Sequence, residues 1–338
     1  ANSGRCAPGG GVVEAADSIR GRQHGLATTV AGTSLSEAAE PTELGCVTFR
    51  FLVACVCCAI DPSARTRLAA IDVSSVDWDL LRRLARENRV DVLLLHGMRQ
   101  GPLHAIPPDV IASLEAYEVD NRHRNAASLV VLDSILGELA RRATSCLLFK
   151  GPVLAQQAYP DAGMRFYWDL DLLVRKTDLR AVDDALRPLR YERDAFSKRQ
   201  EKLYARYHFA HTYSPAVEGP DIDVHWSLFP ANLPIPVDYA GLRQRSTPID
   251  IGGIRATTFS REDTLVYLAL HGAKEEWRRL QMIADVAAMV AAHADLDWQA
   301  CWRIADQWHA CRKLRLALHL ASTWLGAKLP PNATQRVE

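Results

Sequence analysis

Two acidic residues within a short apolar segment give the strongest chemical signal in this sequence. Asp169 and Asp171 alternate with leucines in the run from Trp168 to Val174. Side chains alternate between the two faces of a β-strand, so both carboxylates point to one face and the leucines between them to the other. Adjacent carboxylates repel each other and are costly to desolvate unless a cation lies between them. The pattern therefore predicts a divalent-metal site.

A Lys-Gly-Pro sequence lies upstream, between a predicted buried strand at residues 145–149 and a predicted helix at 152–159. Gly151 would let a phosphate approach the backbone closely, and the amides at a helix start can bind phosphate oxygens. Lys150 could pair with a phosphate, and Arg165 could neutralise a triphosphate or departing pyrophosphate. For both, a basic side chain in solvent is the alternative. Together with the acidic strand, these residues predict a site for a metal-bound nucleoside triphosphate.

A third carboxylate is needed if Asp169 and Asp171 hold two divalent ions, and Asp223 is the best candidate. It lies in a predicted strand at residues 221–226, whose neighbour along the chain, 207–213, is expected to pair with it as an antiparallel hairpin. We expect Asp223 to ligate one metal and to take a proton from an acceptor hydroxyl. The alternative is an edge-strand aspartate in water.

Histidines near this hairpin offer a competing zinc or hydrolytic metal site. His208, His211 and His225 could combine with Asp223 in such a centre. His208 and His211 are three residues apart, however, so they would point to opposite faces of a strand. A common metal centre is therefore disfavoured. His225 shares a face with Asp223 and could orient it or contact substrate.

The remaining sequence predicts an α+β fold with a small mixed β-sheet between two helical regions. Residues 1–42 are rich in Gly, Ala, Ser and Thr without periodicity, and we expect them to be disordered or an extension. Residues 43–142 form the predicted N-terminal helical region. The α/β core is assigned to 143–259, and the C-terminal helical region to 260–328.

Apolar periodicity supports the helical assignments. Residues 47–60 are the most apolar window, but Arg50 interrupts it, and a bilayer span needs about 18–20 apolar residues. We expect a buried helix there, and a long amphipathic helix from Pro108 to Arg142.

The C-terminal helical region carries two local signals. Ser260 and Asp263 have the spacing of a capping box, with Asp in place of Glu. His271, Trp277 and Asp285 are expected on consecutive helical turns. Trp277 is assigned to the core, and His271 could line the cleft, with a packing histidine as the alternative.

Composition limits the partners. Lys plus Arg and Asp plus Glu are 40 each, so net charge gives no argument for a polynucleotide or a membrane. The 8 cysteines show no zinc-ribbon or zinc-finger spacing, and three of them lie in the apolar window. Reduced core cysteines and the absence of a secretion-type N-terminal pattern favour a cytoplasmic protein.

These residues resemble the nucleotidyltransferases of the DNA polymerase β superfamily. Those enzymes carry Gly-Gly or Gly-Ser at a helix start, an Asp-x-Asp strand and a third carboxylate on a later strand. More closely, the chain looks like the uncharacterised bacterial nucleotidyltransferase family, some members of which are encoded beside lasso-peptide and other natural-product genes. The resemblance covers about residues 46–326. The matching pieces are Leu148–Pro152, Arg165, Trp168–Val174, Ile222–Trp226, His271, Trp277 and Asp285.

The resemblance implies a nucleotidyltransferase core at the centre of the chain. It assigns metal binding to Asp169, Asp171 and Asp223, and phosphate binding to Gly151. One position departs from the wider superfamily, because Pro152 replaces a second Gly or Ser and so removes one N–H donor. Lys150 or Arg165 could compensate for the lost donor.

The predicted activity is Mg²⁺-dependent transfer of a nucleoside monophosphate from a nucleoside triphosphate, with ATP as the expected donor and pyrophosphate as the product. The expected acceptor is a hydroxyl of a peptide, a small molecule or a protein, with lasso-peptide tailoring as the setting suggested by the resemblance. Two alternatives remain. One is a catalytically weak nucleotide-binding or regulatory protein that retains the fold, which Pro152 favours; the other is a metal-dependent phosphohydrolase.

Overall fold

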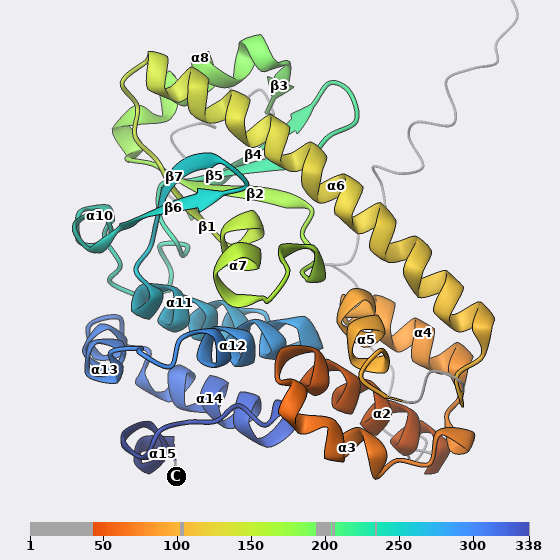
Figure 1. Ribbon diagram of the computed structural model, residues 1–338. Helices are drawn as coiled ribbons and strands as arrows, with labels where there is room; N and C mark the ends of the chain where they lie inside the picture. The colour runs from red at the N-terminus through yellow and green to blue at the C-terminus, as the bar shows by residue number, and fades with distance from the viewer. Residues whose placement is uncertain (1–42, 102–104, 194–203, 205–206, 234, 338) are drawn as a thin grey trace, which may run out of the picture. The chain divides into compact units, whose positions relative to one another are not determined.

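The computed structural model describes residues 43–337 apart from 102–104, 194–203, 205–206 and 234. The prediction for residues 1–42 lies outside the described residues. At the centre is a 7-stranded sheet with the strand order β3-β4-β5-β2-β1-β7-β6 (Figure 1). The strands are β1 (Leu147–Phe149), β2 (Asp169–Leu173), β3 (Tyr191–Glu192), β4 (Ala210–Pro215), β5 (Asp221–His225), β6 (Thr247–Ile251) and β7 (Ile254–Thr258).

The sheet is mixed, as predicted. β2 pairs with β5 in parallel and with β1 antiparallel, and β1 pairs with β7 in parallel. β4 and β5 form the predicted antiparallel hairpin, and β6 and β7 form a second one around the Gly252-Gly253 turn. The central position of β2, next to both β1 and β5, places its side chains beside those of two other strands.

The helices comprise a long central one and groups before and after the sheet (Figure 1). Those before β1 are α2 (Glu43–Ile60), α3 (Arg65–Ala69), α4 (Trp78–Glu87), α5 (Asp91–Met98) and α6 (Pro108–Arg141). Those between the strands are α7 (Gly151–Ala158), α8 (Leu179–Leu186) and α10 (Tyr239–Arg245). Those after β7 are α11 (Arg261–Lys274), α12 (Leu280–Ala292), α13 (Trp298–Gln307), α14 (Cys311–Leu325) and α15 (Pro331–Val337).

The two faces of the sheet pack against different helices. Leu170 and Leu172 of β2 belong to a buried cluster with Leu132 and Ile135 of α6 and with Val182 of α8. Side chains from the opposite face belong to a larger cluster that includes residues of α7, α11, α12 and the N-terminal helices. Alternation along β2 therefore directs Asp169 and Asp171 away from α6 and toward the α7 side.

Two helical predictions are confirmed. α2 is largely buried, as expected for residues 47–60, and none of the described helices is long and apolar enough to cross a membrane. Ser260 caps α11: its hydroxyl accepts from the Asp263 N–H and donates to the Asp263 carboxylate. The Ser260 half of the capping box is thus formed, whereas the Asp263 carboxylate accepts from the Ser260 hydroxyl and not from the Ser260 N–H.

One helical prediction is wrong. His271 and Asp285 lie on separate helices, because α11 ends at Lys274 and α12 begins at Leu280. Glu276 and Trp277 between them have positive φ angles of 56° and 53°, which no α-helix contains. The connection between the two helices places Glu275 and Arg279 in the lining of the cavity described below.

Candidate active site

The parallel pairing of β2 with β5 sets the geometry of the acidic cluster. Asp171 is in register with Asp223, and Asp169 with Asp221. Residues in register on neighbouring strands project from the same face. The sheet therefore brings Asp223 beside Asp171 without any loop, and the strand alternation that defines the Asp-x-Asp pattern is what makes this possible.

Asp171 is fully buried and has two cationic or polar partners. One of its oxygens, Oδ1, accepts from Lys150 Nζ at 2.9 Å and lies 3.0 Å from His225 Nε2. Burial alone would raise the pKa of this carboxyl, but the Lys150 ammonium and His225 hold it well below its usual range. Asp171 is therefore a permanent carboxylate whose orientation is fixed by two side chains.

The second oxygen of Asp171 is unsatisfied. Oδ2 is buried and has no hydrogen-bond partner among the described residues, which is unusual for a charged atom. Asp171, Asp223 and His225 each offer one ligand atom, all within 4.8 Å of one another. Carboxylate oxygens are the ligands that hard divalent ions prefer, and an imidazole suits several other divalent metals. The donor set and the unsatisfied oxygen fit a divalent cation.

His225 also has a fixed position. Its ring packs edge-on against Phe149 at 5.0 Å between centroids, and its Nδ1 is buried without a hydrogen-bond partner. Thr212 of β4 donates to Asp223 Oδ1 at 2.6 Å. Asp223 and His225 are therefore held by neighbouring strands. The ring of His211 stacks on Tyr204, and the candidate metal cluster found among the described residues does not include His211.

Asp169 differs from Asp171 in its ionisation. Burial raises its pKa to about 6, and the nearby charges of Asp171 and Asp223 act in the same direction. Lys150 and Arg165 oppose this shift and do not cancel it. Two carboxylates on one strand thus have pKa values pushed apart by their surroundings, as happens at many sites with acid–base or metal chemistry.

The Lys150-Gly151 step has an unusual backbone. Lys150 has φ +53° and Gly151 φ +37°, both in a region that residues with a side chain rarely adopt. A Cβ at Gly151 would lie 3.1 Å from the carbonyl oxygen of Asp169. Only glycine fits there without displacement, and α7 begins at this residue. The conformation turns the Lys150 side chain toward Asp171 and leaves the Gly151 backbone open to a cavity.

That cavity has a volume of about 250 Å³ and lies on the α7 side of Asp169. Its polar lining comes from segments far apart in the sequence and includes four lysine and arginine side chains and three carboxylates, those of Asp169, Glu275 and Asp285. The lining includes Arg89, Lys150, Gly151, Arg165, Asp169 and Arg279. A cavity with several cations around a helix start is suited to a polyphosphate.

Arg165 occupies this cavity wall as part of a buried ion pair. Its Nε and Nη2 donate to the two oxygens of Asp285 at 2.8 and 2.9 Å, and Tyr159 donates to the same carboxylate at 2.7 Å. Arg165 is also within reach of the Gly151 carbonyl, at 3.4 Å. Its charge is therefore largely compensated by the protein, and its assignment to phosphate binding stays a prediction.

Two further arginines in the cavity were missed by sequence reasoning. Within the described residues, neither Arg89 nor Arg279 makes a side-chain hydrogen bond or an ion pair; Arg89 only stacks on Phe166, at 5.2 Å. Burial lowers the pKa of Arg89, and the charge of Arg279 lowers it further. No sequence pattern identified either arginine as a binding residue. Arg89 follows the end of α4, and Arg279 lies in the connection before α12, where the sequence suggested a continuous helix.

The predicted site residues therefore fall into two adjoining groups. Lys150, Asp171, Asp223 and His225 form one connected cluster. Gly151, Arg165 and Asp169 line the cavity beside it. The arrangement combines a candidate metal cluster with a cationic cavity, and Lys150 belongs to both.

Comparison with known proteins gives the following matches. Residues 74–326 match a family described as "Uncharacterised nucleotidyltransferase". No curated protein matches the chain. Among solved structures, the chain is similar to the antibiotic-resistance factor ANT(2'')-Ia, with 11% identity, a TM-score of 0.39, and coverage of 58% of this chain and 97% of that one. It is also similar to an antigenic nucleotidyltransferase-like protein from Paracoccidioides brasiliensis, with 17% identity, a TM-score of 0.34, and coverage of 61% and 95%.

Proposed function

The chain belongs to the uncharacterised nucleotidyltransferase family, and from this premise we propose that it transfers a nucleoside monophosphate from a Mg²⁺-bound nucleoside triphosphate to an acceptor hydroxyl, releasing pyrophosphate. One observation carries the proposal. Asp171 and Asp223 lie in register on adjacent parallel strands, and the unsatisfied Asp171 Oδ2 belongs to the same cluster.

Asp171, Asp223 and Asp169 would hold the metal ions, with His225 keeping Asp171 in place. When bound, Mg²⁺ would neutralise charge that develops on the α-phosphoryl group and on the leaving pyrophosphate. Lys150 now compensates the charge of Asp171 and would be free to pair with a phosphate when a metal takes over that role. Most of the rate enhancement in such a site comes from positioning and electrostatics.

The β- and γ-phosphates would lie in the cationic cavity. Arg89 and Arg279 contribute uncompensated guanidinium groups, and Gly151 contributes the backbone N–H at the start of α7. Arginine suits this role because its donors match phosphate oxygens bidentately. These two arginines supply the donors that Pro152 removes from the wider superfamily's helix start.

Asp223 would take the proton from the acceptor hydroxyl. Burial raises its pKa, and the charge of Asp171 raises it further, which makes Asp223 a stronger base than an aspartate in water. Thr212 holds one of its oxygens and leaves the other available. We propose a hydroxyl of a peptide or small molecule as acceptor, as in natural-product tailoring, with ATP as donor in the cytoplasm.

The first test is calorimetric titration of each nucleoside triphosphate, with Mg²⁺ or with chelator, into the wild type and its variants. Asp223→Asn is the preferred site variant, since removing Asp171 would leave the Lys150 ammonium buried without a partner and destabilise the fold. We expect Mg²⁺-dependent binding that Asp223→Asn weakens at least tenfold. Asp221→Asn, on the same strand face two residues away, is the matched control and should bind like the wild type.

Turnover gives the second readout. Pyrophosphate release from α-labelled triphosphate should require Mg²⁺ and fall by at least 10²-fold in Asp223→Asn. A folded wild type that binds no nucleotide under any condition would instead support a non-catalytic role, the alternative that Pro152 favours. Labelled monophosphate that appears only in free form, with every acceptor preparation, would identify a phosphohydrolase.

A further inference from the structure

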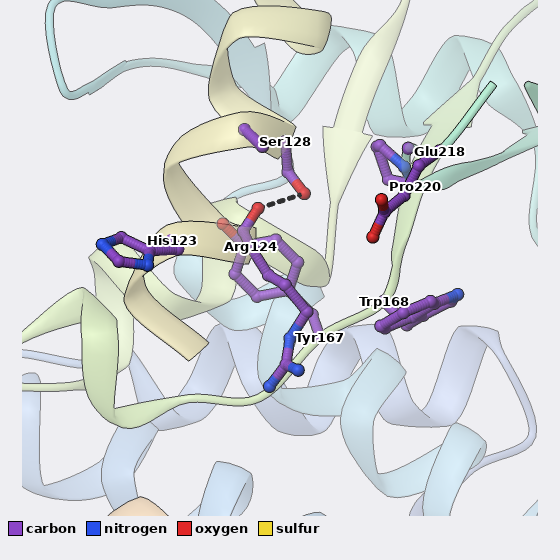
Figure 2. Close-up of a pocket in the computed structure, with 9 residues that line it drawn as sticks. His123, Arg124, Ser128, Tyr167, Trp168, Glu218 and Pro220 are labelled. Carbon is purple, nitrogen blue, oxygen red and sulfur yellow. Dashed lines mark hydrogen bonds between the residues drawn. The ribbon is translucent and has the colours of Figure 1, made fainter. Parts of the chain in front are cut away.

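A second cavity, of about 390 Å³, lies where β2 and β5 begin. Its walls come from α6, from the segment before β2 and from the turn before β5 (Figure 2). Figure 2 shows Trp168 and the turn with Glu218 and Pro220 on one side, and Arg124 and Ser128 of α6 with Tyr167 on the other. No role in the proposed reaction has yet been assigned to this cavity.

The second cavity adjoins the cationic one. Tyr167 lines both, Trp168 lines the second, and Asp169, the next residue, lines the first. The two cavities therefore adjoin at residues 167–169, at the start of β2. A molecule whose phosphates lie beside Asp169 would place the group attached to them near Trp168.

Trp168 offers an aromatic surface to this cavity. Its side chain is 47% exposed, which is unusual for a tryptophan whose neighbours Tyr167 and Leu170 are buried. Exposed aromatic surface beside a polar cleft is a common platform for stacking planar rings. The guanidinium of Arg124, on the other side of the cavity, lies 5.8 Å from the centroid of the Trp168 ring.

Arg124 has hydrogen-bonding capacity that the protein does not use. Its Nε and Nη2 are buried and have no hydrogen-bond partner in the part of the chain that the structure describes, and they lie among the rings of Tyr117, Phe166 and Trp168. No carboxylate forms an ion pair with Arg124 within the described residues. An unsatisfied guanidinium is costly unless a small shift gives it an acceptor, so a ligand with acceptor atoms on its edge would be stabilised here.

We propose that this second cavity holds the base of the donor nucleotide, stacked on Trp168 with its edge toward Arg124 and Glu218. A base has an apolar face for Trp168, acceptor atoms for Arg124, and exocyclic amino groups for the Glu218 carboxylate. The volume lies in the range of small-molecule pockets and suits one nucleoside. The inference rests on the proposed function, because it requires the triphosphate in the adjoining cavity.

The test separates the base from the phosphates by using two kinds of probe. Affinities of Mg²⁺-bound ATP, GTP, CTP and UTP, and of Mg²⁺-bound tripolyphosphate, are measured calorimetrically for the wild type, Trp168→Ala and Trp168→Phe. We expect the preferred triphosphate to bind about 10- to 100-fold more weakly to Trp168→Ala, because stacking on an aromatic side chain contributes that much. Tripolyphosphate should bind both proteins equally, and Trp168→Phe should keep most of the nucleotide affinity.

Trp324→Ala is the matched control, because Trp324 is 40% exposed and lines a different cavity. It should bind every probe like the wild type, and thermal melts should show all variants folded. Nucleotide affinity unchanged in Trp168→Ala would overturn the proposal. If turnover then fell, the cavity would belong to the acceptor. A wild type that binds neither tripolyphosphate nor nucleotide would refute the donor site itself, and the base pocket with it.

Discussion

The cationic cavity contains arginines in two opposite situations. Arg165 is buried and bound through two nitrogens to Asp285, whose carboxylate also accepts from Tyr159. Arg89 and Arg279 line the same cavity, and within the described residues no carboxylate pairs with either. The charge of Arg165 is thus compensated by Asp285, whereas the charges of Arg89 and Arg279 are available to bind an anion from solution.

The difference between the paired Arg165 and the unpaired Arg89 and Arg279 follows from the segments in which these arginines lie. Arg165 and Asp285 join the segment before β2 to α12, so their pair contributes to the cavity wall. Arg89 and Arg279 lie in connections between helices, after α4 and before α12 respectively. Their positive charges repel each other. A cavity can therefore be cationic while only part of its positive charge is available for binding.

The largest expected effect comes from breaking the compensated pair. Arg165→Met would leave the Asp285 carboxylate buried without its cation, which typically costs 3–5 kcal/mol of unfolding free energy. Urea denaturation at neutral pH measures the change. Arg261→Met, which breaks the exposed pair with Asp295, is the control and should change stability by less than about 1 kcal/mol. An equal loss of unfolding free energy in both variants would show that the buried pair contributes no more to stability than the exposed one.

A smaller effect is expected from Asp169, which faces the same cavity. Its pKa is raised from 3.8 to about 6 in the folded protein, so folding favours its protonated form. As pH rises through about 4 to 6, the unfolded chain loses the Asp169 proton before the folded protein does, so the free energy of unfolding falls. Above that range the buried carboxylate destabilises the metal-free protein. Asp169→Asn should stabilise the metal-free protein by roughly 2–3 kcal/mol at pH 7.5, with the difference vanishing near pH 4.

Thermal or urea unfolding with chelator, across that pH range, measures the difference between the two proteins. Asp221→Asn, in register with Asp169 on the neighbouring strand, is the control. A gain that did not depend on pH would assign the effect to packing instead of charge.

The smallest effect concerns the uncompensated arginines. Arg89→Met and Arg279→Met should each weaken Mg²⁺-bound tripolyphosphate about tenfold, because a hydrogen bond to a charged group contributes about 1.5–3 kcal/mol. Stability should stay the same or rise slightly, since each change relieves repulsion between the two. Calorimetry and urea denaturation on the same samples give both values. A variant that lost stability but kept its affinity for tripolyphosphate would show that its arginine, like Arg165, stabilises the fold and does not bind phosphate.

Periodicity allowed much of the fold to be predicted. Alternation over Trp168–Val174 and 221–226 placed the three carboxylates on strands, and the Pro- and Gly-containing turn between 213 and 221 indicated the β4–β5 hairpin. The parallel pairing of β2 with β5 was not predicted, because register between strands distant in sequence depends on long-range packing. The structure does place Asp223 beside Asp171, although it does so through this parallel pairing, and the metal-binding role of Asp223 stays a prediction.

The cavity was less accessible to sequence reasoning. Arg165 was selected because it precedes the acidic strand, and its partner Asp285 lies 120 residues away, which no local pattern indicates. Arg89 and Arg279 lie outside the helices, in connecting segments, and only the tertiary fold brings them into the same cavity. Local signals identify residues that carry chemistry on regular elements, and they miss residues that loops bring together.

The backbone of Lys150 has a consequence for how this protein can change. A residue with φ +53° and ψ −146° is strained by about 1–3 kcal/mol, and glycine would relieve most of that strain. Glycine would also remove the ammonium group that pairs with the buried Asp171 carboxylate, and breaking a buried pair typically costs about 3–5 kcal/mol. The ion pair therefore outweighs the backbone strain, and it holds a lysine at a position where backbone conformation alone favours glycine. Glycine becomes the better residue at position 150 only in a protein whose residue 171 carries no charge.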